Sequence, residues 1–163
     1  MLSSLAFVLL LFSFVLIILA GSTPLCTKIS EIYRNKQQLI RQSGKQLLIV
    51  VITDGEPSDG SHDDLRREIV NVTANGDCHV SFAECTDEES DMDYLDRWDG
   101  QIRNFDNTED FRDEQRRVRQ VNGPNFKFDY SDYVVKILLA TFVRWYFNLD
   151  QGAVNNSNYN RNW

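Results

Sequence analysis

A carboxylate stands at the end of an apolar run in this chain. Residues 47–53 read LLIVVIT, and Asp54 and Gly55 follow directly. Such a carboxylate can bind a cation or a ligand, because ligands of parallel α/β sheets gather at the carboxyl ends of the strands. It can equally cap a helix or shape the turn that continues to residue 60. The pattern alone leaves both roles open for Asp54.

Thr23 is the second oxygen ligand that the sequence offers. It lies in the segment GSTPL, residues 21–25, where Pro24 suits the first turn of a helix and Ser22 or Thr23 suits the cap. Because this helix is expected to begin at the sheet edge where Asp54 lies, the two side chains are expected to converge. Magnesium and manganese take about six oxygen ligands, so two protein oxygens predict a weak site.

Catalytic motifs are missing from the sequence. His62 and His79 have no metal-ligand spacing to a cysteine or to each other, and no G-x-S-x-G nucleophile motif occurs. The three cysteines contain no C-x₂-C pair and therefore give no zinc signature. The sequence predicts a protein that is not an enzyme.

The elements that must position Asp54 and Thr23 alternate between helix and strand. Apolar residues at helical spacing predict helices over residues 24–43, 61–76, 90–102 and 131–146. Short apolar runs predict strands over residues 46–52 and 78–84, and residues 105–128 are expected to form a partly helical connection broken at the sequence NGP. This order predicts a parallel α/β sheet with helices on both faces.

The charge balance argues against nucleic acid as a partner. The chain has 24 acidic and 17 basic residues and a net charge of −7, whereas nucleic-acid binding depends on lysine and arginine. The densest basic stretch, residues 111–120, mixes arginine with acidic residues and is expected to be a solvated helix face. We expect one domain over residues 21–150 and a disordered, Asn-rich tail over residues 151–163.

The first 20 residues contain no charged side chain. A membrane anchor, a cleaved secretory signal and a buried core segment are three interpretations of this run. Basic residues such as Lys28 and Arg34 follow the run and none precedes it, which favours a single-pass anchor with a cytoplasmic C-terminal domain. We therefore predict a hydrophobic helix over residues 1–20 that attaches the chain to a membrane, with a secreted or a soluble intracellular protein as alternatives.

The combination of motifs resembles part of the von Willebrand factor A domain. The strand and turn LLIVVITDGEPSDG, preceded by GSTPL, follow the order of that family, and ECTDEESD from residue 84 is similar to a turn of its intracellular members. The resemblance covers roughly residues 21–148. It implies a doubly wound, Rossmann-like parallel sheet flanked by helices, and a metal site that contains Thr23 and Asp54.

The resemblance also implies which loops surround that metal. They contribute Ser22, Gly55, Glu56, Asp59, Thr86 and Asp87 at the ligand-binding edge. The family's Asp-x-Ser-x-Ser motif and its first strand are missing, so the resemblance implies a partial domain with a degenerate magnesium or manganese site. The expected function is a protein-interaction module that binds an acidic group of a protein through the metal. The alternative is a metal-free structural remnant, truncated or tethered to a membrane, without a specific ligand.

Overall fold

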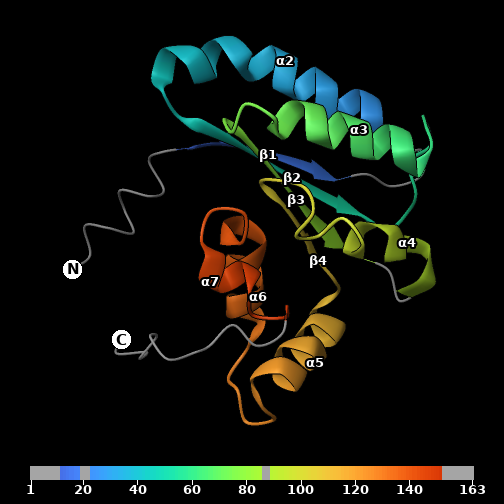
Figure 1. The fold of residues 1–163 in the computed structure, drawn as a ribbon, viewed down its shortest axis with the longest axis vertical. Helices are drawn as coiled ribbons and strands as arrows, with labels where there is room; N and C mark the ends of the chain where they lie inside the picture. Colours follow the sequence, from blue (N-terminus) through green and yellow to red (C-terminus); the bar gives the residue numbers. More distant parts are fainter. Residues whose placement is uncertain (1–11, 19–22, 86–88, 152–163) are drawn as a thin grey trace.

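The computed structural model describes residues 12–18, 23–85 and 89–151 of the chain. They form an α/β fold with one sheet, in which four parallel strands lie in the order β1–β2–β3–β4. The strands are β1 (Phe12–Ile18), β2 (Gln46–Thr53), β3 (Cys78–Glu84) and β4 (Phe105–Thr108). Because all four run in the same direction, their carboxyl ends meet at one edge of the sheet (Figure 1).

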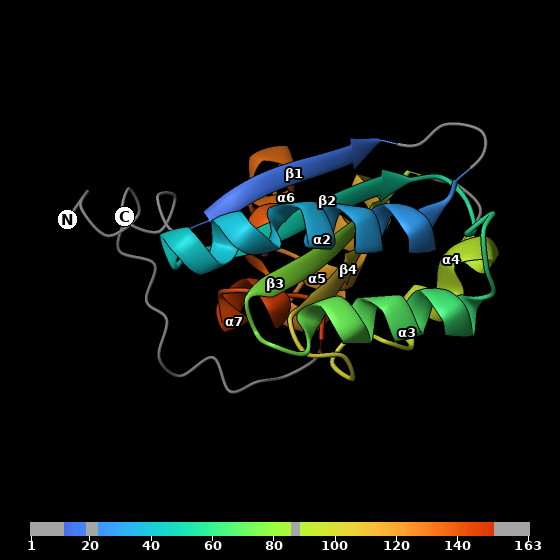
Figure 2. The ribbon, with the colours of Figure 1, turned by 90° about the horizontal axis from the view of Figure 1, so that it is seen from above.

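Three helices connect the strands and cover one face of the sheet. They are α2 (Leu25–Ser43), α3 (His62–Thr73) and α4 (Glu89–Asp96). Gly44 ends α2 in the left-handed conformation, with φ of 64°, and its N–H bonds to Ile40 O. Ser61 begins α3 with a reciprocal capping box that includes Asp64. Figure 2 shows α2 and α3 side by side over the strands.

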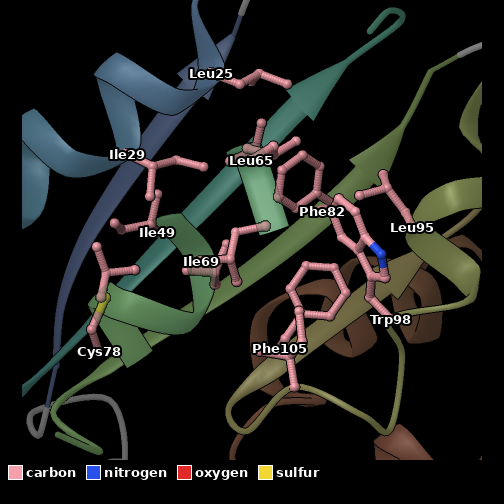
Figure 3. Packing of buried hydrophobic residues seen from close by; sticks show 14 of the residues in the cluster. Leu25, Ile29, Ile49, Leu65, Ile69, Cys78, Phe82, Leu95, Trp98 and Phe105 are labelled. Carbon is pink, nitrogen blue, oxygen red and sulfur yellow. The ribbon is translucent and has the colours of Figure 1, made fainter. Parts of the chain in front are cut away.

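The core between these helices and the sheet is apolar. Its buried side chains come from all three helices and from β2, β3 and β4. Figure 3 shows Leu65 of α3, Phe82 of β3 and Trp98, which follows α4, meeting in this layer. Alternate residues of β2, Leu47, Ile49 and Val51, point into it. Each fully buried side chain of this size contributes about 1.5–3 kcal/mol to folding.

The other face of the sheet is covered by the C-terminal part of the chain. Its helices are α5 (Phe111–Asn122), α6 (Tyr130–Leu139) and α7 (Arg144–Phe147). Helix α6 contacts β2, β3 and β4 directly, and Figure 1 shows α6 and α7 on the side of the sheet opposite α2. Asp129 begins α6 with a capping box that includes Asp132. Helices therefore lie on both faces, as the sequence predicts.

A buried lysine joins α6 to its surroundings. Lys136 Nζ lies 3.3 Å from Glu114 Oε1, 3.3 Å from Asp150 Oδ2 and 4.0 Å from Asp106 Oδ2. These carboxylates come from α5, from the segment after α7 and from β4, so one cation connects three separate parts of the chain. Removing Lys136 would leave these buried carboxylates without their counter-ion, which would destabilise the fold by about 3–5 kcal/mol.

The predicted hydrophobic helix over residues 1–20 is wrong where the structure describes that segment. Residues 12–18 form β1, which pairs in parallel with β2 from Phe12–Gln46 to Ile18–Ile52. The segment FSFVLII is rich in aromatic and β-branched residues, and its backbone groups bond to the edge of β2. None of the helices in the described ranges combines the length and apolar character that crossing a membrane requires. Membrane attachment and a cytoplasmic location stay predictions.

Two further differences lie in the C-terminal half. Strand β4 falls within the segment that the sequence left unassigned, because FDNT is short and polar. The single helix expected over residues 131–146 is broken after Leu139, and α7 is a separate turn. Val143 is extended at this break, and the ring of Phe142 stacks on His79 of β3 with the centroids 3.8 Å apart. Tertiary packing therefore overrides the helical pattern.

The burial of β2 on both faces gives a direct test of the sheet. Val50 is 1% exposed, lies between Leu16 and Ser81 in register, and points to the face covered by α6. Val50→Asp buries an unpaired charge and is expected to lower the free energy of unfolding by several kcal/mol. Chemical denaturation measures the change. Val70→Asp, at a position 39% exposed on α3, is the control, and equal midpoints for the two variants would contradict the central position of β2.

Candidate ligand site at the carboxyl edge of the sheet

The turn after β2 places Asp54 at the surface. Thr53 is 1% exposed, and its Oγ1 accepts a hydrogen bond from Gly55 N at 3.3 Å and lies 3.2 Å from Gly55 O. This local bonding folds the chain back immediately after the strand. Asp54 is exposed at the tip, and its carboxylate has no hydrogen bond or ion pair within the described residues. The turn is therefore built by Thr53 rather than by Asp54.

Thr23 connects the loop before α2 to the same turn. Its side chain is buried, and Oγ1 donates a hydrogen bond to Glu56 O. Its backbone carbonyl accepts a hydrogen bond from Ser58 N at 2.9 Å. Thr23 thus lies at the sheet edge that the sequence predicts, next to the turn that carries Asp54. Because Oγ1 donates its proton to Glu56 O, a cation could bind only to the lone pairs of Oγ1.

Asp59 caps α2 from the other side of the turn. Its carboxylate accepts hydrogen bonds from Cys26 N at 3.2 Å and from Thr27 N at 2.8 Å. Partial burial alone would raise the pKa of Asp59, but the bonds from Thr27 and Cys26 outweigh it and lower the pKa below its ordinary value. The sequence predicts Ser22 or Thr23 as the cap of α2. For Thr23 this prediction is wrong, because its side chain bonds to Glu56 O instead. A carboxylate more than thirty residues away replaces the local cap.

A second group of carboxylates lies at the ends of β3 and β4, which sequence reasoning missed. Glu84, the last residue of β3, accepts a hydrogen bond from Asn107 Nδ2 at 2.7 Å. Asn107 Nδ2 also donates to Asp96, and Arg117 pairs with both Asp96 at 2.6 Å and Glu109 at 2.5 Å. Burial raises the pKa of Glu84 to about 7 and that of Glu109 to about 8. Glu109 follows β4, and without that strand the sequence could not place it at this edge.

The outcome for the residues expected at the metal site is mixed. Thr23 bonds to Glu56, Gly55 bonds to Thr53 and Asp59 bonds to the start of α2, so these residues belong to one edge structure. Asp54 is exposed in the same turn. Ser22, Thr86 and Asp87 lie outside the described residues. In the parts of the chain that the structure describes, histidine, cysteine, aspartate and glutamate form no group of three or more that could hold a metal ion. Thr23 and Asp54 together fit at most a weak cation site.

The fold and this edge define a parallel α/β protein with a polar strand-end site. Comparison of the chain with protein-family models, with curated proteins and with solved structures finds no match. The class of the protein therefore follows from its architecture, and its function has to be proposed from the site.

The cap of α2 gives a test of the edge structure. Asp59→Ala leaves the N–H groups of Cys26 and Thr27 without their side-chain acceptor and removes one of the links between α2 and the turn. We expect a loss of about 1 kcal/mol in the free energy of unfolding, measured by chemical denaturation. Asp63→Ala, which removes an exposed carboxylate from the first turn of α3, is the control. If both variants lose the same small amount, Asp59 has no specific role as a cap.

Buried carboxyl groups make stability depend on pH. Burial raises the pKa of Asp106 to about 6, of Glu114 to about 7 and of Asp99 to about 8. A carboxyl whose pKa is raised in the folded state binds its proton more tightly there, so its contribution to stability is present at low pH and is lost as pH rises through about 4 to 8. Burial lowers the pKa of His79 to about 4, so His79 opposes folding as pH falls below about 6.5.

The chain is therefore expected to be more stable at pH 5.5 than at pH 8.5 and to lose about 1–2 kcal/mol or more over this range, since one pKa unit corresponds to about 1.4 kcal/mol and three carboxyls outweigh the single histidine. Urea denaturation across this range measures the change. Glu114→Gln removes one of the titrating groups and should flatten the dependence. Stability that stays constant or increases from pH 5.5 to pH 8.5 in the unaltered chain would contradict the assignment.

Proposed function

We propose that this chain is a non-enzymatic protein-interaction module whose binding edge is formed by Thr23 and the turn 54–59. The observation that supports the proposal is that the residues that hold the turn together are not the residue that carries the exposed carboxylate. Thr53 and Asp59 provide the bonds that hold it, whereas Asp54 is exposed and its carboxylate makes no hydrogen bond or ion pair within the described residues. A rigid turn that presents an unused carboxylate is suited to binding, because little conformational entropy is lost when a ligand arrives.

The proposed ligand is an acidic group of a protein, held through a divalent cation. Asp54 would supply a carboxylate oxygen and Thr23 its hydroxyl oxygen, both of which are hard ligands that magnesium and manganese prefer. The cation, when bound, supplies the positive charge that an acidic ligand needs at an edge where Glu56 is also exposed. The resemblance of GSTPL and TDGEPSDG to the von Willebrand factor A domain supports the same assignment. Two protein oxygens limit the site to weak binding.

A metal-free structural remnant is the second candidate. It is favoured by the hydrogen bond from Thr23 to Glu56 and by the cap that Asp59 provides, since both serve the fold without a ligand. In that case the edge keeps α2 and the turn together and has no specific partner. The two candidates differ in the effect of a cation on the native state.

A titration of thermal stability with magnesium and with manganese tests the proposal. Binding to the native state stabilises it by RT ln(1 + [L]/Kd), so a millimolar cation with a millimolar Kd adds about 0.4 kcal/mol. This corresponds to an increase of about 1–2 °C in Tm. The increase should disappear in Asp54→Ala and persist in the matched variant Asp63→Ala, which loses an exposed carboxylate elsewhere.

Two results would count against the metal site. A shift that persists in Asp54→Ala would show that the cation binds elsewhere. No shift in the unaltered chain, together with a lower Tm for Asp54→Ala at every cation concentration, would assign Asp54 to the turn and favour the structural remnant.

A further inference from the structure

Helix α5 carries a row of exposed arginines on the side opposite its buried residues. Arg112, Arg116 and Arg119 are exposed and are spaced four and three residues apart, so they lie within about 60° of one another around the helix axis. The opposite side of α5 carries Glu114 and Val118, which are fully buried. The packing of Glu114 and Val118 therefore orients α5 so that the three arginines face solvent.

The three arginines line an open groove of about 520 Å³. The loop after α5 closes one side of it, and the remaining lining residues include Gln120, Gly123 and Pro124. Among the described residues, no acidic side chain lines the groove. We call this surface the arginine groove. In a chain with a net charge of −7, a groove with three cations and no carboxylate in its lining is a local reversal of the overall charge.

The ion pairs that connect α5 and α6 to other elements use cations outside the groove, although Arg116 also forms a pair within α5. Arg117, on the same helix, pairs with Asp96 and Glu109, and Lys136 is surrounded by buried carboxylates. Arg116 pairs with Asp113. Arg112 stands in the first turn of α5, where the positive end of the helix dipole makes a cation unfavourable. Helix stability therefore does not account for the presence of Arg112 in the groove.

We propose that the arginine groove is a docking surface for a short acidic peptide segment of a partner protein. The guanidinium group donates two parallel hydrogen bonds to a carboxylate, and three such groups lie along one side of the helix over about 10 Å. An extended peptide places alternate side chains about 7 Å apart, so two or three of its carboxylates reach the row. A nucleic-acid backbone is bound through many phosphates that lysine and arginine neutralise, and a row of three arginines over about 10 Å offers few such contacts.

Binding of a fluorescein-labelled octaglutamate peptide to the full chain, measured by fluorescence anisotropy at about 50 mM salt, tests the proposal. The variant Arg112→Gln/Arg116→Gln/Arg119→Gln removes the row. Glutamine has nearly the helix propensity of arginine, so α5 is expected to remain folded, which circular dichroism verifies. Affinity for the peptide is expected to fall about tenfold or more.

The control variant Arg34→Gln/Lys36→Gln/Arg41→Gln makes the same change in net charge on α2. It should change the affinity less than about twofold, since the charges on α2 are screened beyond roughly 14 Å at this salt concentration. Addition of EDTA should have no effect, which separates this surface from the cation site at Thr23 and Asp54.

Three results would overturn the proposal. The first is no binding of octaglutamate at low salt, which would leave the arginines as a solvated helix face. The second is an equal loss of affinity in both variants, which would show a response to net charge only. The third is tighter binding of a single-stranded oligothymidylate that is also lost in the α5 variant, which would assign the groove to nucleic acid.

Discussion

The burial of β2 on both faces is the constraint on which the rest of the structure depends. Its backbone is paired on both edges, to β1 and to β3, and its side chains alternate between two covered faces. A strand of this kind cannot be left against water, so the chain must place helices on both sides of it. Helices α2 and α3 cover the first face as crossovers between neighbouring strands. The second face is covered by α6, which comes from the C-terminal third of the chain. The sheet is therefore complete only when both ends of the sequence have folded onto it.

The two faces are covered by different chemistry. The face under α2 and α3 is a continuous apolar core, whereas the face under α6 includes Lys136 and its carboxylates. Desolvation by burial is the main cause of the raised pKa of Asp106 and Glu114; Lys136 opposes it, and the neighbouring carboxylate of Asp150 adds to it. An ion set of this kind adds little net stability compared with apolar packing, but it penalises any arrangement that leaves one of its members unpaired. It therefore restricts how α5 and α6 can attach to the sheet.

The sequence predicts the elements whose pattern is strong and local. The period of apolar residues predicts α2 and α3, and unbroken β-branched runs predict β2 and β3. Elements that depend on distant partners were missed. FDNT becomes β4 because it pairs with Val80–Ala83, and FSFVLII becomes β1 because the edge of β2 is available to it. Apolar composition alone cannot distinguish such a strand from a membrane helix, since both environments exclude water.

The edge site also has a part that follows from the local sequence pattern and a part that depends on a contact between distant residues. Parallel strands and their crossovers bring Thr23 and Asp54 to one edge, and this much follows from the order of the elements. The contact between Asp59 and the start of α2 joins residues more than thirty positions apart and has no local signal. That contact bears on the role of Asp54. The sequence offers one carboxylate with two roles, a cap for the fold or a ligand for a cation. Asp59 takes the role of the cap, so the start of α2 does not require Asp54, and cation binding by Asp54 is the role that we propose.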